Sequence, residues 1–224
     1  MSDKLTEFRK SIDQDDGLNS KRKLLVVVCV IFLSLNLTGA TIEEANTFLF
    51  KIKFSNHAGL GYLFLAGIVF LTIRYYAYAQ DYHSKLFDFW SGRMLADDRI
   101  LMLSHEYGVI GGVLKPVFES ANANPEHVEN TRYYVGGIFK RYISFPFNGE
   151  FDGVSYVIRS RIELNKFNEN WKFKDYLRIL TVEFKYQVEA VFRYRESLDL
   201  LAPYLLSIAA ILSYIFKDKI LLLI

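Results

Sequence analysis

The sequence predicts a mainly α-helical membrane protein with three transmembrane helices, two of which extend into a cytoplasmic α+β part with a small antiparallel β-hairpin. Three observations support this class. The 224 residues are 51% hydrophobic, and the mean hydropathy of +0.12 is high for a soluble chain. Three long segments carry no charge, and one later stretch alternates between apolar and polar residues. A net charge of +2 excludes a polybasic nucleic-acid binder or an acidic disordered tail as the whole protein.

The first apolar segment follows Lys21, Arg22 and Lys23 and extends from residue 24 to residue 40. At ~1.5 Å per residue it forms roughly 25 Å of helix, which is short for a bilayer core of about 30 Å. A buried helix of a soluble protein is one alternative, but such helices carry polar residues every few positions. A cleaved signal peptide is another, but the acidic residues before Lys21 are unusual for one. Residues 1–23 are expected to form a cytoplasmic amphipathic segment.

The second and third segments are residues 58–73 and 200–216. The second ends at Arg74, Tyr75 and Tyr76, a combination typical of a membrane interface. Residues 24–79 are therefore expected to form a transmembrane hairpin, and residues 200–224 a C-terminal transmembrane helix and tail. The basic residues predict a cytoplasmic N-terminus and a cytoplasmic domain over residues 80–199.

Two stretches of the cytoplasmic part are typical of strands. Residues 133–145 are rich in aromatic and β-branched side chains, and residues 154–164 alternate strictly. Asn148-Gly149 and Asp152-Gly153 between them predict the turn of a hairpin. Residues 171–216 are interrupted only by Pro203 and predict one long helix that enters the membrane directly. Its stripe of apolar residues includes Phe173, Leu177, Phe184 and Val188.

No pattern in the sequence predicts catalysis. The four histidines are far apart, the single cysteine lies in the first apolar segment, and no nucleotide-binding, hydrolase or zinc-protease motif is present. We therefore expect no enzyme, no cofactor and no metal.

Basic residues interleaved with aromatic ones are concentrated late in the cytoplasmic part. This surface is a candidate contact for a protein partner, for a nucleic-acid backbone or for anionic lipid headgroups; the alternative is an ordinary solvated face. The candidate contact residues are Arg132, Lys140, Arg141, Arg159, Arg161, Lys172 and Lys174.

Small and polar side chains occur inside the apolar segments. Ser34 and Asn36 in the first, and Ser207 and Ser213 in the third, can hydrogen-bond between helices. Ala209 and Ser213 form a pair that permits close helix approach. These residues favour assembly of the spans, including a homo-oligomer.

The stretch from Leu33 to Tyr82 carries a family resemblance. Its residues are LSLNLTGATIEEAN, then KIKFSN, then GYLFLA and IRYY. This stretch resembles the transmembrane effectors of bacterial anti-phage systems, most closely those associated with retrons. The resemblance implies an inner-membrane toxin held inactive by a partner complex of a reverse transcriptase with its RNA–DNA product. Once released, such an effector would permeabilise or depolarise the membrane. A non-toxic membrane adaptor or sensor subunit and a small oligomeric channel are the alternatives.

Overall fold

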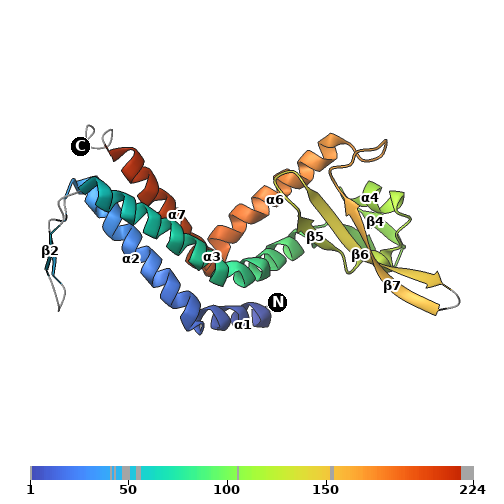
Figure 1. Ribbon diagram of the computed structural model, residues 1–224. Helices are drawn as coiled ribbons and strands as arrows, with labels where there is room; N and C mark the ends of the chain where they lie inside the picture. The colour runs from blue at the N-terminus through green and yellow to red at the C-terminus, as the bar shows by residue number, and fades with distance from the viewer. Residues whose placement is uncertain are drawn as a thin grey trace. The chain divides into compact units, whose positions relative to one another are not determined.

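The computed structural model describes residues 2–40, 42, 44–46, 51–53, 57–104, 106–151 and 154–217. The fold is mainly helical, with small antiparallel sheets (Figure 1). The chain divides into two compact units, the first formed by Met1–Ser84 and Tyr194–Ile224 and the second by Lys85–Arg193. These boundaries lie within a few residues of the predicted cytoplasmic limits at 80 and 199. Residues 1–23, expected as a separate segment, belong to the first unit.

The first unit is built from helices whose ends follow local sequence signals. Helix α1 is Ser2–Asp13 and α2 is Asp16–Thr38. The Asp15 carboxylate accepts a hydrogen bond from the backbone N–H of Leu18 and caps α2, which ends at Gly39 with a positive φ of 68°. Strands β1 (Glu44–Asn46) and β2 (Lys51–Lys53) pair before α3 (His57–Leu95) begins.

Two helices in the described part of the chain are long and apolar enough to cross a membrane, namely α3 and α7 (Arg195–Ile215). They match the second and third predicted spans. The first predicted span, in α2, is not one of these two: the uncharged part of α2 begins only at Leu24, directly after Lys21, Arg22 and Lys23, and ends at Thr38. That part is about 22 Å of helix, against the roughly 30 Å of a bilayer core.

The second unit combines the last turns of α3 with sheets and shorter helices. Helix α3 continues without a break through Ser91 and Gly92. The other elements are β3 (Met102–Ser104), β4 (Val109–Gly111), α4 (Lys115–Ser120), α5 (Pro125–Val128), β5 (Arg132–Val135), β6 (Arg141–Phe151), β7 (Val154–Glu163) and α6 (Phe173–Arg193).

The predicted hairpin is part of a three-stranded antiparallel sheet, in the order β5-β6-β7. The stretch 133–145 was expected as one strand but is divided into β5 and β6. Gly137 between them has a φ of +149°, which only glycine adopts without strain. Asn148 and Gly149 lie within β6, not in a turn. Asp152 and Gly153, the other half of the predicted turn, lie outside the described residues.

The prediction of a single helix over residues 171–216 is wrong. Tyr194 has extended backbone angles, φ −108° and ψ 112°, and separates α6 from α7. Pro203, in contrast, lies inside α7. Proline lacks the N–H that would bond to the carbonyl of Asp199. The Tyr75 hydroxyl compensates, lying 3.5 Å from that carbonyl and 3.2 Å from the carbonyl of Leu200.

Candidate functional site

One face of the three-stranded sheet brings basic and aromatic side chains together. The register aligns Arg132 on β5 with Ser144 on β6, and Ser144 with Arg161 on β7. Arg159 lies one step along β7, opposite Pro146. Because alternate residues of a strand point to the same side, the three arginines share this face, and all three are exposed.

Two tyrosines lie on the same face, and the register aligns one of them, Tyr142, with Glu163 on β7. Tyr134 and Tyr142 are cross-strand neighbours whose rings stack with centroids 5.3 Å apart. The Arg161 guanidinium lies over the Tyr142 ring, 3.3 Å from its centroid. We call Arg132, Tyr134, Tyr142, Arg159 and Arg161 the open sheet face. Arginines that reach phosphate oxygens, beside aromatic rings that stack on bases, are the chemistry of single-stranded nucleic-acid binding.

Arg141 does not belong to this surface, which corrects the sequence prediction. Its side chain points to the opposite side of the sheet and is buried against α6. Its Nε donates to Oε2 of Glu183 at 2.7 Å, and the Tyr133 hydroxyl donates to the same oxygen, also at 2.7 Å. Burial, together with the negative charge of Glu183, raises the pKa of Tyr133, so its hydroxyl stays a hydrogen-bond donor. This network is structural.

The three predicted lysines are exposed and lie outside the strands of the sheet. Lys140 lies in the connection between β5 and β6, Lys172 immediately precedes α6, and Lys174 is on its first turn. The structure therefore gathers three of the seven predicted contact residues on one surface. Sequence reasoning omitted Tyr134 and Tyr142 from the candidate contact residues, although their position in a strand rich in aromatic residues was a signal for them.

The residues expected at the membrane interface differ in exposure. Lys23, Arg74 and Tyr76 are exposed. The ammonium of Lys21 lies 5.9 Å from the ring centroid of Tyr78. Tyr75 is fully buried, so its side chain does not face outward.

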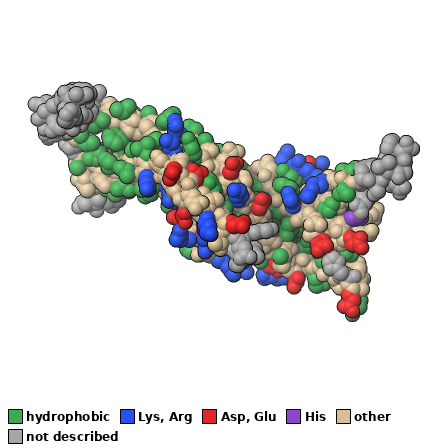
Figure 2. All heavy atoms as spheres, turned by 90° about the horizontal axis from the view of Figure 1, so that it is seen from below, with side chains coloured by type: hydrophobic (Ala, Val, Ile, Leu, Met, Phe, Trp, Pro, Cys, Tyr) green, Lys and Arg blue, Asp and Glu red, His purple; other side chains and the backbone are tan. Residues whose placement is uncertain are grey.

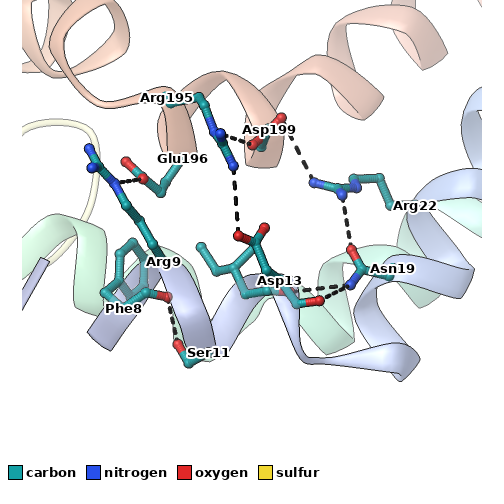
Figure 3. Close-up of polar contacts among 10 residues, drawn as sticks. Phe8, Arg9, Ser11, Asp13, Asn19, Arg22, Arg195, Glu196 and Asp199 are labelled. Carbon is teal, nitrogen blue, oxygen red and sulfur yellow. Dashed lines mark hydrogen bonds and ion pairs between the residues drawn. The ribbon is translucent and has the colours of Figure 1, made fainter. Parts of the chain in front are cut away.

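Arg22 takes part in a charged cluster that joins three helices of the first unit (Figure 3). Arg9 of α1 donates to the carboxylate of Glu196 on α7. Arg195 lies 3.7 Å from Asp13 of α1 and 3.7 Å from Asp199 of its own helix. Arg22 of α2 lies 3.9 Å from Asp199. The charged cluster consists of Arg9, Asp13, Arg22, Arg195, Glu196 and Asp199.

Glu196 is the buried centre of this cluster, whereas its partner Arg9 is half exposed. One carboxylate oxygen of Glu196, Oε2, and the hydroxyl of the neighbouring Ser197 are buried and have no hydrogen-bond partner. A buried carboxylate is stable only while its counter-charge stays in place. The sequence held no signal for this pairing, because Arg9 and Glu196 lie at opposite ends of the chain.

Polar side chains also meet inside the apolar part of the first unit. Asn36 of α2 donates to Ser213 of α7 at 3.1 Å. The Thr72 hydroxyl of α3 donates to Ser207 at 3.1 Å, and the Cys29 sulfur lies 3.6 Å from the same hydroxyl. We call these five residues the polar seam. The predicted interhelical bonding of Asn36, Ser207 and Ser213 is confirmed.

The same prediction is wrong for Ser34. Its hydroxyl donates to the carbonyl of Val30 within α2, at 2.8 Å, and the side chain is exposed. The predicted close-packing pair is also only half present, since Ser213 is buried but Ala209 is exposed.

The outer surface of these helices is apolar. Figure 2 shows hydrophobic side chains dominating the end of the first unit that is remote from α1, with charged side chains gathered near α1. Large exposed residues include Val27 and Ile31 on α2, Leu63 and Phe70 on α3, and Leu205. An apolar exterior around a polar seam reverses the arrangement of a soluble protein and suits a lipid environment.

The described residues contain no group of three or more His, Cys, Asp or Glu side chains that could hold a metal ion. Comparison of the chain with protein-family models, with curated proteins and with solved structures finds no match. The candidate functional features are therefore the open sheet face, the charged cluster and the polar seam.

Proposed function

We propose that this chain is a membrane effector of bacterial anti-phage defence. Its helices lie in the inner membrane with the N-terminus and the second unit in the cytoplasm, and a complex of a reverse transcriptase with RNA–DNA holds it inactive. On release it permeabilises or depolarises the membrane. The proposed activity and the proposed partner are taken from the resemblance of residues 33–82 to retron-associated membrane effectors.

The observation that carries the proposal is the open sheet face. A surface that combines three exposed arginines with two stacked tyrosines fits a nucleic-acid strand: the guanidinium groups contact phosphates, and Tyr134, at the end of the stack remote from Arg161, stacks on a base. An RNA–DNA product held by a reverse transcriptase offers such a strand. The same face would equally serve a non-toxic adaptor, so the experiment must separate the two functions.

The membrane part of the proposal is supported by the two candidate spans and by the apolar exterior of α2. Helix α2 is short, but a short span is accommodated by local thinning of the bilayer. The polar seam gives the helices hydrogen bonds that can be exchanged for contacts with other copies or with water when they rearrange.

The first test is capture of the full chain from membranes at native expression, in mild detergent, scoring polypeptides and nuclease-sensitive nucleic acid together. We expect a reverse transcriptase with attached RNA–DNA. Replacing Arg132, Arg159 and Arg161 together by Gln should reduce this capture. The matched control replaces three exposed lysines outside the face, Lys10, Lys85 and Lys115, by Gln and should leave it unchanged. A homo-oligomer free of nucleic acid would overturn the proposal.

Depletion of the partner then separates effector from adaptor. An effector loses the membrane potential when the partner is removed, and loses it only with intact spans. An adaptor leaves the potential and dye exclusion unchanged. A constitutive channel conducts in pure liposomes whether or not the partner is added.

A further inference from the structure

The apolar stripe of helix α6 faces outward. Phe173, Leu177, Phe184, Val188 and Phe192 recur every one or two helical turns, and between 40% and 82% of each side chain is exposed. We call these residues the α6 stripe. The residues that α6 buries are instead Tyr176, Ile179, Glu183 and Ala190. Contiguous exposed apolar residues of this kind mark an interaction surface.

Cationic side chains border the stripe on one side. Lys174, Arg178 and Lys185 are all exposed and lie along the same edge of α6. The nearest acids offset them only in part. Asp175 lies 4.0 Å from Arg178, while Glu189 is already paired with Arg93 at 2.7 Å and with Arg193 at 2.9 Å.

A cavity opens beside this cationic edge, with a volume of about 430 Å³. Its apolar lining comes from Ile100, Val113, Leu177 and Val182. Arg99, Lys174 and Arg178 supply its positive charge. Arg99 is held by Asp97, whereas no ion pair in the described part of the chain involves Lys174. An apolar space surrounded by cations fits a molecule with an anionic head and a hydrocarbon tail.

From these two observations we propose that the α6 stripe and the adjoining cavity form a docking site for anionic phospholipid, so that α6 lies along the membrane surface. An amphipathic helix with a bulky apolar face and basic flanks binds in the headgroup region, with its apolar side chains among the upper acyl carbons. The inference rests on the proposed membrane location of the first unit.

Chain continuity makes the bilayer the partner that this surface meets first. Helix α6 ends at Arg193, and α7, a candidate span, begins at Arg195. A span in the bilayer therefore tethers the C-terminal end of α6 near the headgroups. A second copy of the chain is a poorer occupant, because antiparallel pairing of two stripes would set one cationic edge against the other.

The test uses full-length chain in vesicles, with Cys29→Ser and a nitroxide on one introduced cysteine. Phe184→Cys reports on the stripe, Val157→Cys on the opposite side of the sheet, and Val69→Cys on the apolar exterior of α3. A high collision rate of the nitroxide with oxygen shows that the label lies in lipid. A high collision rate with a water-soluble nickel chelate shows that it lies in water. Vesicles are phosphatidylcholine alone or with phosphatidylglycerol.

In vesicles with phosphatidylglycerol we expect the labels at 69 and 184 in lipid and the label at 157 in water. In phosphatidylcholine alone the label at 184 should move toward water. Replacing Lys174, Arg178 and Lys185 together by Gln should weaken docking by roughly fivefold for each cation, because each contributes about 1 kcal/mol near an anionic surface.

Three outcomes would overturn the inference. The label at 184 could match the label at 157 in both kinds of vesicle; it could lie in lipid without dependence on phosphatidylglycerol or the three cations; or it could show spin–spin broadening, which would identify a contact between copies. The label at 69 separates failure of this inference from failure of the proposed function. If the label at 69 stays in lipid, only the docking of α6 is wrong; if it lies in water, the proposed membrane location is wrong.

Discussion

Arg141 on β6 and Glu183 on α6 form a buried ion pair with an Nε–Oε2 distance of 2.7 Å, which joins the inner side of the sheet to the helix. The Tyr133 hydroxyl and the Gln187 amide also donate to the Glu183 carboxylate. Glu183 lies on the same buried side of α6 as Ile179 and Ala190, so the ion pair helps to fix which side of the helix packs inward. The α6 stripe lies on the other side and is exposed.

Replacement of Glu183 by Ala should destabilise the second unit by about 3–5 kcal/mol, because it leaves the buried Arg141 without its counter-charge. The measurement is chemical unfolding of the purified chain in detergent, followed by the fluorescence of Trp90 and Trp171, which are both buried in the same unit. Glu163→Gln is the control, since its pair with Lys166 is partly exposed and contributes at most about 1 kcal/mol. Equal effects of the two substitutions would contradict the structural role of the pair.

Asp97 should make stability depend on pH. Hydrogen bonds from the Arg99 side chain and backbone and from the Tyr186 hydroxyl hold the pKa of its carboxyl well below the ordinary value of 3.8. A carboxyl whose pKa is lowered by folding stabilises the protein above its unfolded pKa, and this stabilisation is lost as pH falls toward its folded pKa.

Asp97→Asn should therefore lower the unfolding midpoint at pH 7, and the difference from wild type should shrink as the pH is brought below about 4. The exposed neighbour Asp98, changed to Asn, is the control and should differ little from wild type. A difference between wild type and Asp97→Asn that stays constant from pH 7 to pH 3 would contradict the assignment.

Arg9→Gln should release α1 from α7, because it leaves the buried Glu196 carboxylate without its counter-charge. Hydrogen exchange should become faster in the backbone amides of residues 5–13. The double variant Arg9→Gln with Glu196→Gln should recover part of the protection, since it also removes the buried charge. Lys10→Gln, on the same helix, is the control. Unchanged exchange in Arg9→Gln would show that other contacts hold α1.

Gly61→Ala should disturb packing between α3 and α7. A Cβ at this position would lie 2.5 Å from Cε2 of Tyr214, so the ring must leave its stack with Phe32. Overpacking of this kind costs about 1–3 kcal/mol. The matched control is Gly67→Ala on the same helix, where a Cβ would meet nothing within 4 Å. That change should be neutral or stabilising, because Ala favours a helix by about 1 kcal/mol over Gly. Thermal unfolding in detergent measures both, and equal midpoints would contradict the contact.

Helices α2, α3 and α7 and strand β7 follow largely from local sequence signals, whereas the break at Tyr194 and the extension of β6 through Asn148 and Gly149 do not. The Asp15 cap, the Gly39 end of α2 and the uncharged runs of α3 and α7 can all be read from neighbouring residues. The alternation over residues 154–164 likewise predicts β7. These features depend on residues one or two turns apart, so the order of the amino acids is enough to predict them.

Which side chains are buried was decided by tertiary structure. Arg141 and Arg161 look equivalent in the sequence, yet strand alternation and register bury the first and expose the second on the open sheet face. Tyr75 is buried and its neighbour Tyr76 is exposed, because the two side chains point in different directions around α3. Pairs such as Arg9 with Glu196 join opposite ends of the chain. Whether a side chain is buried depends on which distant residues it contacts in the folded chain. Those contacts cannot be predicted from neighbouring residues alone, because strand register and helix packing decide them.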